Sequence, residues 1–206
     1  METILLSGGD LSYAVEVFLR GGLVGVPTET VYGLAGNALN KDAVAEIYEV
    51  KGRPAIKPLS LLVPNLEVAE TVCAVIPESA RKLAEAFWPG PLTIVLKKRD
   101  TVPDIVTAGG DTIGVRCPDH AKTIEFLRLA ALPAAAPSAN VSDKPSPKSA
   151  QDVLDYFDGK IECVIDGGVC ALGVESTLVD LTVEPYRILR QGALPEEEIK
   201  RVLAQI

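Results

Sequence analysis

The short apolar run at residues 23–26, which two glycines precede and Pro27 ends, constrains the fold more than any other stretch of the chain. A run of this length between turn-forming residues is typical of a buried strand. Three hydroxyls and a carboxylate follow directly, on Thr28, Thr30, Tyr32 and Glu29. Because open α/β sheets place their ligands beyond strand ends, this loop is a candidate binding segment.

A helical pattern over residues 40–51 follows the loop, and Gly52 is placed to end it in a left-handed cap. Three cations then occur within seven residues, at Lys51, Arg53 and Lys57. They form either an anion site or a solvated basic helix end that complements the helix dipole. Spacing alone does not decide between these two interpretations.

The rest of the chain mixes short strands and helices without strict alternation. Further strands are predicted at residues 59–63, 92–98, 112–116, 134–136, 161–165, 177–181 and 186–189. Further helices are predicted at residues 11–20, 66–75, 78–88 and 121–130, after Ser149 and after Pro195. The cations at residues 97–99 are expected to mark a solvated sheet edge. This order predicts an α/β fold with α+β character, a twisted mixed sheet with helices on its faces.

Composition bounds the kind of protein. A chain of 206 residues, 48% hydrophobic and 23% charged, predicts a single domain over residues 1–206. Its 28 acidic against 20 basic residues give a net charge of −8, which disfavours the broad positive field of nucleic-acid binders. We find no apolar run near the ~20 residues of a membrane span and no basic leader, so we expect a cytoplasmic protein without membrane contact.

Several catalytic classes lack their motifs. The chain contains no GxxxxGK[ST], no GxGxxG and no GxSxG, which argues against a P-loop, a dinucleotide fold and a serine hydrolase. His120 is the sole histidine, and the four cysteines lack CxxC spacing, so no protein-built metal site is expected. Buried, reduced thiols are the expected state of the cysteines.

Cations and hydroxyls remain as the groups that could carry chemistry. They are Lys51, Arg53, Lys57, Arg116 and Arg190 with Thr28, Thr30, Thr112, Ser138, Asn140, Ser146 and Ser176. Most lie at predicted strand ends, so they could converge on one concave face. A guanidinium group can bind two oxygens of a carboxylate or phosphate at once, and hydroxyls add directional hydrogen bonds to uncharged ligand groups.

Four blocks in this order resemble the YrdC/Sua5 family of threonylcarbamoyl-AMP synthases. They are PTETVYGL from Pro27, KGRP from Lys51, PSAN from Pro137 and GVEST from Gly173, within a likeness that runs over roughly residues 11–192. The resemblance implies a YrdC-type domain with a concave, positively charged cavity. Since the chain stops at Ile206, we expect the short single-domain form without a C-terminal Sua5-type extension.

The resemblance also implies an activity. Similar proteins are nucleotidyltransferases that join L-threonine, bicarbonate or CO2, and ATP into L-threonylcarbamoyladenylate and pyrophosphate. This is the first step toward N6-threonylcarbamoyladenosine at position 37 of tRNA. Mg2+ is expected on the ATP phosphates and not on a protein site. The tRNA threonylcarbamoyl transferase complex is a possible partner, and weak tRNA or double-stranded RNA binding is possible.

Matching the blocks residue by residue assigns roles. The signature expected to act in catalysis is Lys51, Arg53, Ser138 and Asn140. The positions expected to contact ATP are Arg53, Lys57, Thr112, Ser138, Ser146 and Arg190. Those expected to contact threonine are Thr30, Arg116 and Ser176, with Thr28 and Tyr32 beside them. Glu29 either contacts the amine or holds the loop.

Two positions depart from the family pattern, and two alternative functions stay open. Some longer relatives have Asn and His where this chain has Lys57 and Leu62, so these two positions transfer poorly. One alternative function is a binding module of the same fold for double-stranded RNA, although the net charge of −8 opposes strong phosphate binding. The other is a carbamoyl-transferring relative of the hydrogenase-maturation type, which would use a different carbamoyl donor.

Overall fold

The structure is a computed structural model that describes residues 2–205, and its strands join into one sheet in the order β1-β8-β2-β3-β7-β4-β6-β5-β9-β10. The strands are β1 (Ile4–Leu6), β2 (Val24–Val26), β3 (Gly33–Asn37), β4 (Ser60–Leu62), β5 (Leu92–Lys97), β6 (Thr112–Arg116), β7 (Ala134–Ala135), β8 (Cys163–Ile165), β9 (Thr177–Asp180) and β10 (Arg187–Arg190). The helices are α1 (Ser12–Leu19), α2 (Lys41–Lys51), α3 (Leu66–Val72), α4 (Glu78–Phe87), α5 (Ala121–Ala130), α6 (Ala150–Phe157) and α7 (Glu196–Leu203).

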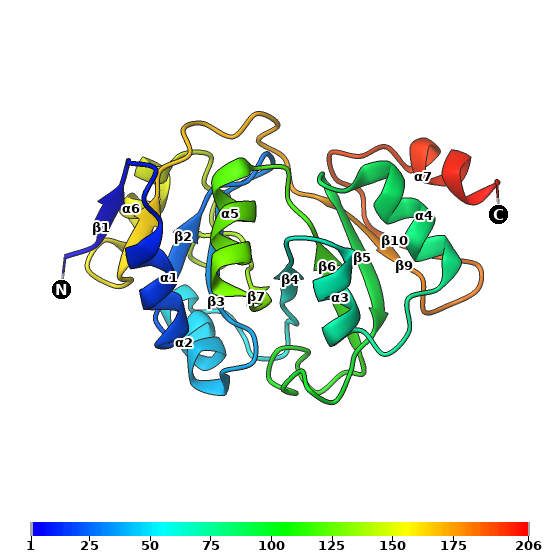
Figure 1. Cartoon of the computed structure of the whole chain (residues 1–206), viewed down its shortest axis with the longest axis horizontal. Helices are drawn as coiled ribbons and strands as arrows, with labels where there is room; N and C mark the ends of the chain where they lie inside the picture. The colour runs from blue at the N-terminus through cyan, green and yellow to red at the C-terminus, as the bar shows by residue number, and fades with distance from the viewer. Residues whose placement is uncertain (1, 206) are drawn as a thin grey trace.

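The sheet mixes parallel and antiparallel pairs, which confirms the predicted fold class. The pairs β1–β8, β2–β8, β4–β6 and β5–β9 are parallel, and the others are antiparallel. Figure 1 shows an elongated molecule with the N-terminal and C-terminal segments at opposite ends. Helices α1 and α5 lie over one end of the sheet, and α3 and α4 lie over the other.

Three details differ from the sequence-based expectations. Strands β1 and β3 were not predicted. Strand β5 was expected to end at a solvated edge, but it lies inside the sheet between β6 and β9. The two lysines at the end of β5 are neutralised locally instead, since Lys97 pairs with Asp111 at 2.6 Å and Lys98 with Asp104 at 3.0 Å.

Alternation along the strands divides the core between the two faces of the sheet. In β2, Val24 and Val26 pack in a cluster with residues of α1 and α5, including Phe18 and Phe126, whose rings meet edge to face at 5.2 Å. In β5, Leu92, Ile94 and Leu96 instead join the larger cluster that holds the buried residues of α3 and α4. The intervening side chain Thr93 therefore points to the opposite face of this half of the sheet.

The middle of the sheet is its narrowest part. Strand β7 has two residues, Ala134 and Ala135, which pair with β3 on one side and β4 on the other. The five strands from β1 to β7 thus connect with the five from β4 to β10 through this single short strand. Alanine side chains here leave the adjacent face open to other groups.

Capping residues fix the helix that precedes the cation cluster. The Asn40 side chain accepts hydrogen bonds from the amides of Asp42 and Ala43 and caps the start of α2. Gly52, at φ 58°, ends the helix in the left-handed conformation, as predicted. The chain therefore turns sharply between Lys51 and Arg53, and these two cations leave the helix in different directions.

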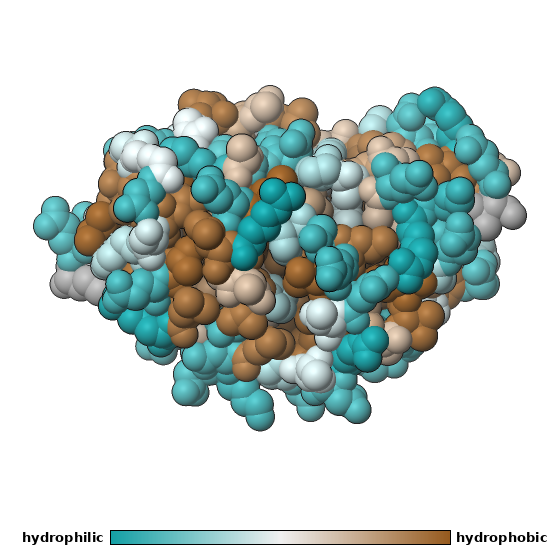
Figure 2. Space-filling view, viewed as in Figure 1, coloured by the Kyte–Doolittle hydropathy of each residue, from teal (hydrophilic) through white to brown (hydrophobic). Residues whose placement is uncertain are grey.

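The outer surface is mostly polar. In Figure 2, apolar side chains reach the surface chiefly on the left and in the middle of the view, over α1 and α5, where Leu19 and Leu129 are 50% and 57% exposed. Over α4 and α7 hydrophilic side chains prevail. Within residues 2–205, no helix combines the length and the hydrophobicity that crossing a bilayer requires.

Candidate functional site

A cavity of about 450 Å³ lies over the middle of the sheet and gathers most of the polar residues that the sequence singled out. Its polar and charged lining consists of Thr28, Thr30, Tyr32, Arg53, Lys57, Ser60, Thr93, Arg116, Ser138, Glu175, Ser176 and Arg190. These come from the loops after β2, β7 and β8, the segment between α2 and β4, and strands β4, β5, β6 and β10. Groups far apart in the sequence therefore share one hollow.

The strand alternation explains two lining residues that the sequence analysis missed. Ser60 and Thr93 are on β4 and β5, and their neighbours Leu61 and Ile94 are in the buried core. A single polar side chain inside an apolar strand was the available signal, since it faces away from its buried neighbours. The cavity thus covers a face of the sheet, whereas the sequence placed most of the site residues at strand ends or in the loops after them.

One end of the cavity, which we call the closed end, consists of Thr28, Thr30, Arg116 and Ser176, with exposed fractions of 0–6%. The Thr28 hydroxyl donates to the Val31 carbonyl at 2.6 Å, so the 2.8 Å contact with Thr30 requires Thr30 to donate to Thr28. Thr30 therefore presents only acceptor lone pairs to a ligand. An amine or a hydroxyl is the kind of group that could donate to it.

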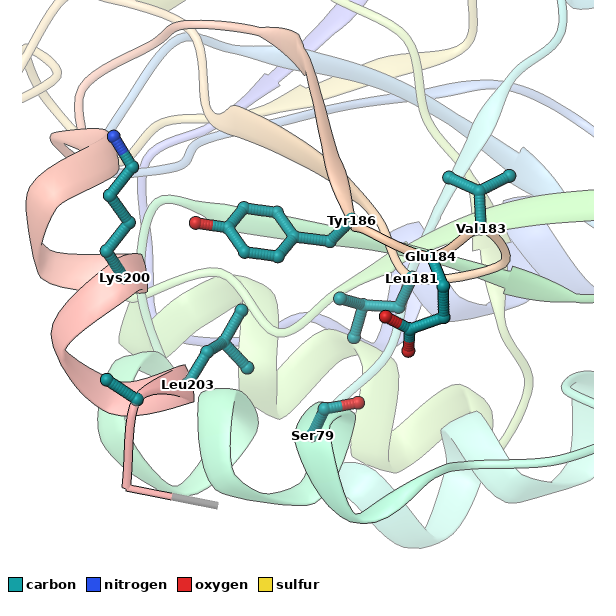
Figure 3. A pocket seen from close by; sticks show the side chains of 8 residues that line it. Ser79, Leu181, Val183, Glu184, Tyr186, Lys200 and Leu203 are labelled. Atoms are coloured by element: carbon teal, nitrogen blue, oxygen red, sulfur yellow. The ribbon is translucent and has the colours of Figure 1, made fainter.

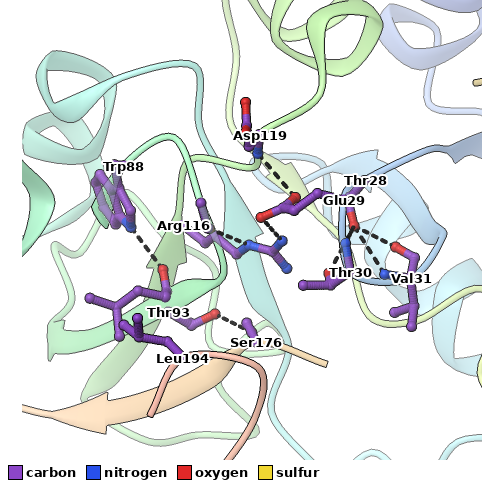
Figure 4. Close-up of polar contacts among 12 residues, drawn as sticks. Thr28, Glu29, Thr30, Val31, Trp88, Thr93, Arg116, Asp119, Ser176 and Leu194 are labelled. Atoms are coloured by element: carbon purple, nitrogen blue, oxygen red, sulfur yellow. Dashed lines mark hydrogen bonds and ion pairs between the residues drawn. The ribbon is translucent and has the colours of Figure 1, made fainter. Parts of the chain in front are cut away.

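Ser176 connects the closed end with two other strands. Its hydroxyl lies 2.8 Å from that of Thr93 (Figure 4). It also accepts a hydrogen bond from Arg190 Nη2 at 3.1 Å. Arg190 Nε also donates to the Ser176 carbonyl at 3.0 Å. Burial, and to a smaller extent the nearby Arg116, lowers the pKa of Arg190. Two guanidinium groups thus approach the same end of the cavity.

Arg116 is buried at the end of β6 and is held from two sides. Its Nε donates to the Gly90 carbonyl at 3.0 Å, and its Nη2 lies 2.7 Å from Glu29 Oε1. Figure 4 shows the side chain extending between the Glu29–Asp119 contact and the Thr93–Ser176 contact toward Thr30. A guanidinium placed this way suits a small carboxylate.

Tyr32 contributes to the wall without offering its hydroxyl. The residue is fully buried, and its Oη donates to the Gly168 carbonyl at 2.8 Å and accepts from the Gly167 amide at 3.0 Å. Burial raises the pKa of Tyr32 to about 12. The ring can contact a ligand, but the hydroxyl is committed to the loop before β9.

A more exposed part of the cavity lining, which we call the open end, consists of Arg53, Lys57 and Ser138. Arg53 donates to the carbonyls of Lys57 and Pro58 at 3.3 and 3.0 Å, so it folds back on its own loop. Lys57 lies 3.5 Å from Asp143, and these side chains are 47% and 85% exposed. Exposed pairs of this kind contribute little stability, so both cations can turn toward an anionic ligand.

Lys51 lies behind the cavity and does not line it. It is 1% exposed, and its Nζ donates to the carbonyls of Ser138 and Asn140, each at 2.5 Å. Burial, with a smaller contribution from Arg53, lowers the pKa of Lys51 to about 7. The structure thus brings Lys51 together with the Ser138–Asn140 segment, but as an anchor of that segment's backbone.

The remaining predicted residues lie near the cavity without lining it. The Asn140 side chain accepts from the Ser138 hydroxyl and donates to the Lys144 carbonyl, both at 2.6 Å, which shapes the loop after β7. Ser146 donates to Glu175 at 2.6 Å, and this hydrogen bond lowers the pKa of Glu175, which does line the cavity. Thr112 begins β6, opposite Lys97.

A second cavity of about 510 Å³ lies between α4, α7 and the segment that joins β9 to β10 (Figure 3). Tyr186 and Leu203 reach into it, and Lys200 stands at its side. Lys200 is already paired with Glu196 at 3.1 Å and Glu197 at 3.4 Å. This cavity lacks the converging cations and hydroxyls of the first.

The cysteines and acidic residues supply no alternative chemistry. Burial raises the pKa of Cys73 and Cys163 to about 12 and that of Cys117 to about 11, so these thiols are poor nucleophiles. Among residues 2–205 no three His, Cys, Asp or Glu side chains are grouped closely enough to hold a metal ion. The first cavity is therefore the candidate site.

Comparisons with known proteins agree on one family. A family model named for Sua5, YciO and YrdC, and described as "Telomere recombination", matches residues 16–192. The chain is 53% identical over 190 residues to a threonylcarbamoyl-AMP synthase of Pyrococcus abyssi, a match that covers 92% of this chain and 56% of that protein. It is 42% identical over 197 residues to the synthase of the same name from Bacillus subtilis, with 95% and 57% covered.

A solved structure extends this similarity to the fold. The crystal structure of P. abyssi Sua5 complexed with L-threonine superposes with a TM-score of 0.95 at 48% identity and covers the whole of this chain and 62% of that one. The chain spans little more than half the length of the two curated relatives above.

Proposed function

The chain belongs to the Sua5/YciO/YrdC family, and we propose that its cavity forms L-threonylcarbamoyladenylate and pyrophosphate from L-threonine, bicarbonate or CO2, and ATP. The proposal follows the names of the relatives and the threonine complex of one of them. The observation that carries it is the pairing, in one cavity of about 450 Å³, of a closed end with a buried arginine and an open end with more exposed cations. An amino acid and a nucleotide need these two environments.

Threonine fits the closed end by complementarity of donors and acceptors. Arg116 offers donors to the carboxylate, and Thr30 offers an acceptor to the amine or to the threonine hydroxyl. Ser176, already held by Thr93 and Arg190, is the second hydroxyl within this wall. We assign threonine to these residues.

ATP is assigned to the open end, where Arg53, Lys57 and Ser138 lie, and to Arg190, which lines the same cavity. The phosphates would replace the carbonyl and Asp143 contacts that the cations make in the free protein. Mg2+ is proposed to arrive on the ATP phosphates. The described residues fit this role of a substrate-borne metal, because Arg53 and Lys57 provide cations for the phosphates that would carry it.

The chemistry needs orientation and charge neutralisation. In the proposed reaction the threonine amine attacks CO2, loses a proton and becomes a carbamate. A carbamate oxygen then attacks the α-phosphorus of ATP, and the bond from the α-phosphorus to the leaving pyrophosphate breaks. Arg53 is assigned to the charge that develops on the phosphates. Lys51 is assigned a supporting task, since it fixes the backbone of the Ser138–Asn140 segment.

Pyrophosphate release is the direct test. We expect release from ATP only when threonine and bicarbonate are both present, with calorimetric binding of each substrate in the micromolar to millimolar range typical of enzymes. Pyrophosphate release that does not depend on threonine would contradict the proposal and favour the carbamoyl-transferring alternative. Salt-sensitive tRNA binding without ATP consumption would favour the RNA-binding alternative.

The wider setting forms part of the same proposal. The product would serve the modification of adenosine 37 in tRNA, in the cytoplasm, and the tRNA threonylcarbamoyl transferase complex would consume it. We propose that residues 1–206 act as a single domain. Addition of that complex and tRNA should convert the adenylate into modified tRNA, which nucleoside analysis would detect.

A further inference from the structure

Glu29 lies between two threonines of the closed end but faces away from the cavity. Its side chain is 10% exposed, with Oε1 2.7 Å from Arg116 Nη2, and Oε2 accepts from the Asp119 amide at 3.0 Å. Its backbone carbonyl accepts from the Leu172 amide at 2.8 Å. Glu29 therefore connects the loop after β2 with the end of β6, the turn before α5 and the loop after β8.

The contacts of Arg116 leave one part of its guanidinium for a ligand. Nε is used by the Gly90 carbonyl and Nη2 faces Glu29, whereas Nη1 donates to no described residue. Arg116 Nη2 and Glu29 Oε1 are buried, and neither makes an aligned hydrogen bond among residues 2–205. Charge attraction holds the pair, and Nη1 is the guanidinium nitrogen left to donate to an acceptor in the cavity.

We propose that Glu29 is a positioning residue, which holds the Arg116 guanidinium with its Nη1 side toward the cavity so that it receives the threonine carboxylate. This inference rests on the proposed function. A buried arginine without a counter-charge would carry a large desolvation cost and would be free to rotate toward other acceptors. The pair therefore supplies both the charge balance and the direction.

The geometry opposes the alternative that Glu29 contacts the threonine amine. Both carboxylate oxygens already face other groups, Arg116 and the Asp119 amide. Glu29 is also absent from the cavity wall, although Thr28 and Thr30 on either side of it belong to that wall. A direct contact would require the carboxylate to leave both partners.

The test measures binding of threonine, of ATP and of threoninol, which lacks the carboxylate, to the full chain by calorimetry. We expect Glu29→Gln to raise the threonine Kd about tenfold, the scale of one charge-assisted hydrogen bond, and to leave the ATP Kd unchanged. Threoninol affinity should hardly change, so the preference for threonine over threoninol should shrink. A merely structural role would weaken all three ligands together.

A matched control and a double-mutant cycle separate the position effect from general destabilisation. Asp180 is a comparable carboxylate, 8% exposed in its side chain and 3.5 Å from Arg187, but it lies away from the cavity. Asp180→Asn should leave the threonine Kd unchanged. In an Arg116→Lys background, Glu29→Gln should add less than about a twofold further loss, since it acts through Arg116.

Several outcomes would overturn the inference. An unchanged threonine Kd in Glu29→Gln, or full additivity with Arg116→Lys, would remove the positioning role while wild-type threonine binding upheld the proposed function. Failure of the wild-type chain to bind threonine would instead remove the proposed function. Should Glu29→Gln not fold, Glu29→Asp decides, because its shorter carboxylate must still weaken threonine selectively.

Discussion

The two ends of the cavity differ in how completely the free protein builds them. At the closed end Thr30, Ser176 and Arg116 are 0%, 4% and 6% exposed. Thr30 is held by Thr28 of its own loop, and Ser176 and Arg116 are held by residues from other segments. At the open end Lys57 keeps 47% of its side chain exposed, and Ile56 at the cavity wall is 83% exposed. A small substrate thus meets a preformed site, whereas a large one meets side chains that must rearrange.

Discrimination between amino acids should give the largest effect and tests how rigid the closed end is. A site built to hydrogen-bond a hydroxyl rejects an analogue without it by about 10⁴–10⁵-fold, because its own polar groups stay unpaired. We therefore expect valine to be used at least about 10³-fold less efficiently than threonine, as kcat/KM for pyrophosphate release. The kcat/KM values with ATP and with GTP, which bind at the open end, should differ far less. Comparable use of valine would show that the closed end is not built for the hydroxyl.

Arg53→Ala should give the next largest effect and tests the open end. We expect pyrophosphate release to fall about 10²-fold or more, because phosphate charge loses its guanidinium partner. Thermal unfolding should shift little, since Arg53 bonds only to carbonyls of its own loop. Threonine binding without ATP should persist in calorimetry. If threonine binding disappears as well, the two ends do not act separately.

Arg116→Lys should give a smaller and more selective effect. A lysine keeps the charge beside Glu29 but loses the planar fork, so the threonine KM should rise about tenfold or more. The ATP KM should stay within about twofold. Kinetics at saturating ATP measure the first value and kinetics at saturating threonine the second. An equal rise in both would place Arg116 in contact with the nucleotide instead.

Lys51 predicts a pH effect that needs no substrate. Its pKa of about 7 in the folded protein lies below the ordinary lysine value near 10.4, so the unfolded chain binds more protons between these two pH values. This group therefore makes stability rise from pH 7 toward pH 10, by at most about 1.4 kcal/mol per pH unit. Urea unfolding at pH 7, 8 and 9 should show a flatter profile for Lys51→Met, and the exposed Lys82→Met should match wild type. If the free energy of unfolding of Lys51→Met rose with pH as steeply as that of the wild type, the anchoring role would be contradicted.

Local signals in the sequence were sufficient where one residue decides an element boundary. Asn40 and Gly52 delimit α2 through a side-chain cap and a left-handed residue, and Ser149 with Asp152 forms the capping box that begins α6. Each signal acts within four residues, so no tertiary information is needed. The grouping of cations and hydroxyls was also foreseeable because most of them end strands or follow them.

The missed features depend on distant partners. Strand β3 has glycine, alanine and asparagine where strands usually carry branched residues, and the reason is close packing: a Cβ at Gly36 would stand 3.0 Å from both Ile47 and Leu23. The sequence left Lys51 between an anion site and a solvated helix end, and neither interpretation included its burial. The carbonyls of Ser138 and Asn140, 87 and 89 residues further along the chain, accept hydrogen bonds from its Nζ. Nothing in the local sequence indicates these partners.

The two-residue strand β7 gives the proposed ligands a mechanical role. Thr28 and Thr30 belong to the half of the sheet on one side of it, and Arg116, Ser176 and Arg190 to the half on the other side. A bound molecule that contacts both sets would bridge the two halves of the sheet at β7, where the fewest backbone pairs join them. Occupancy would then set how far the halves flex against each other, as well as which reaction they host.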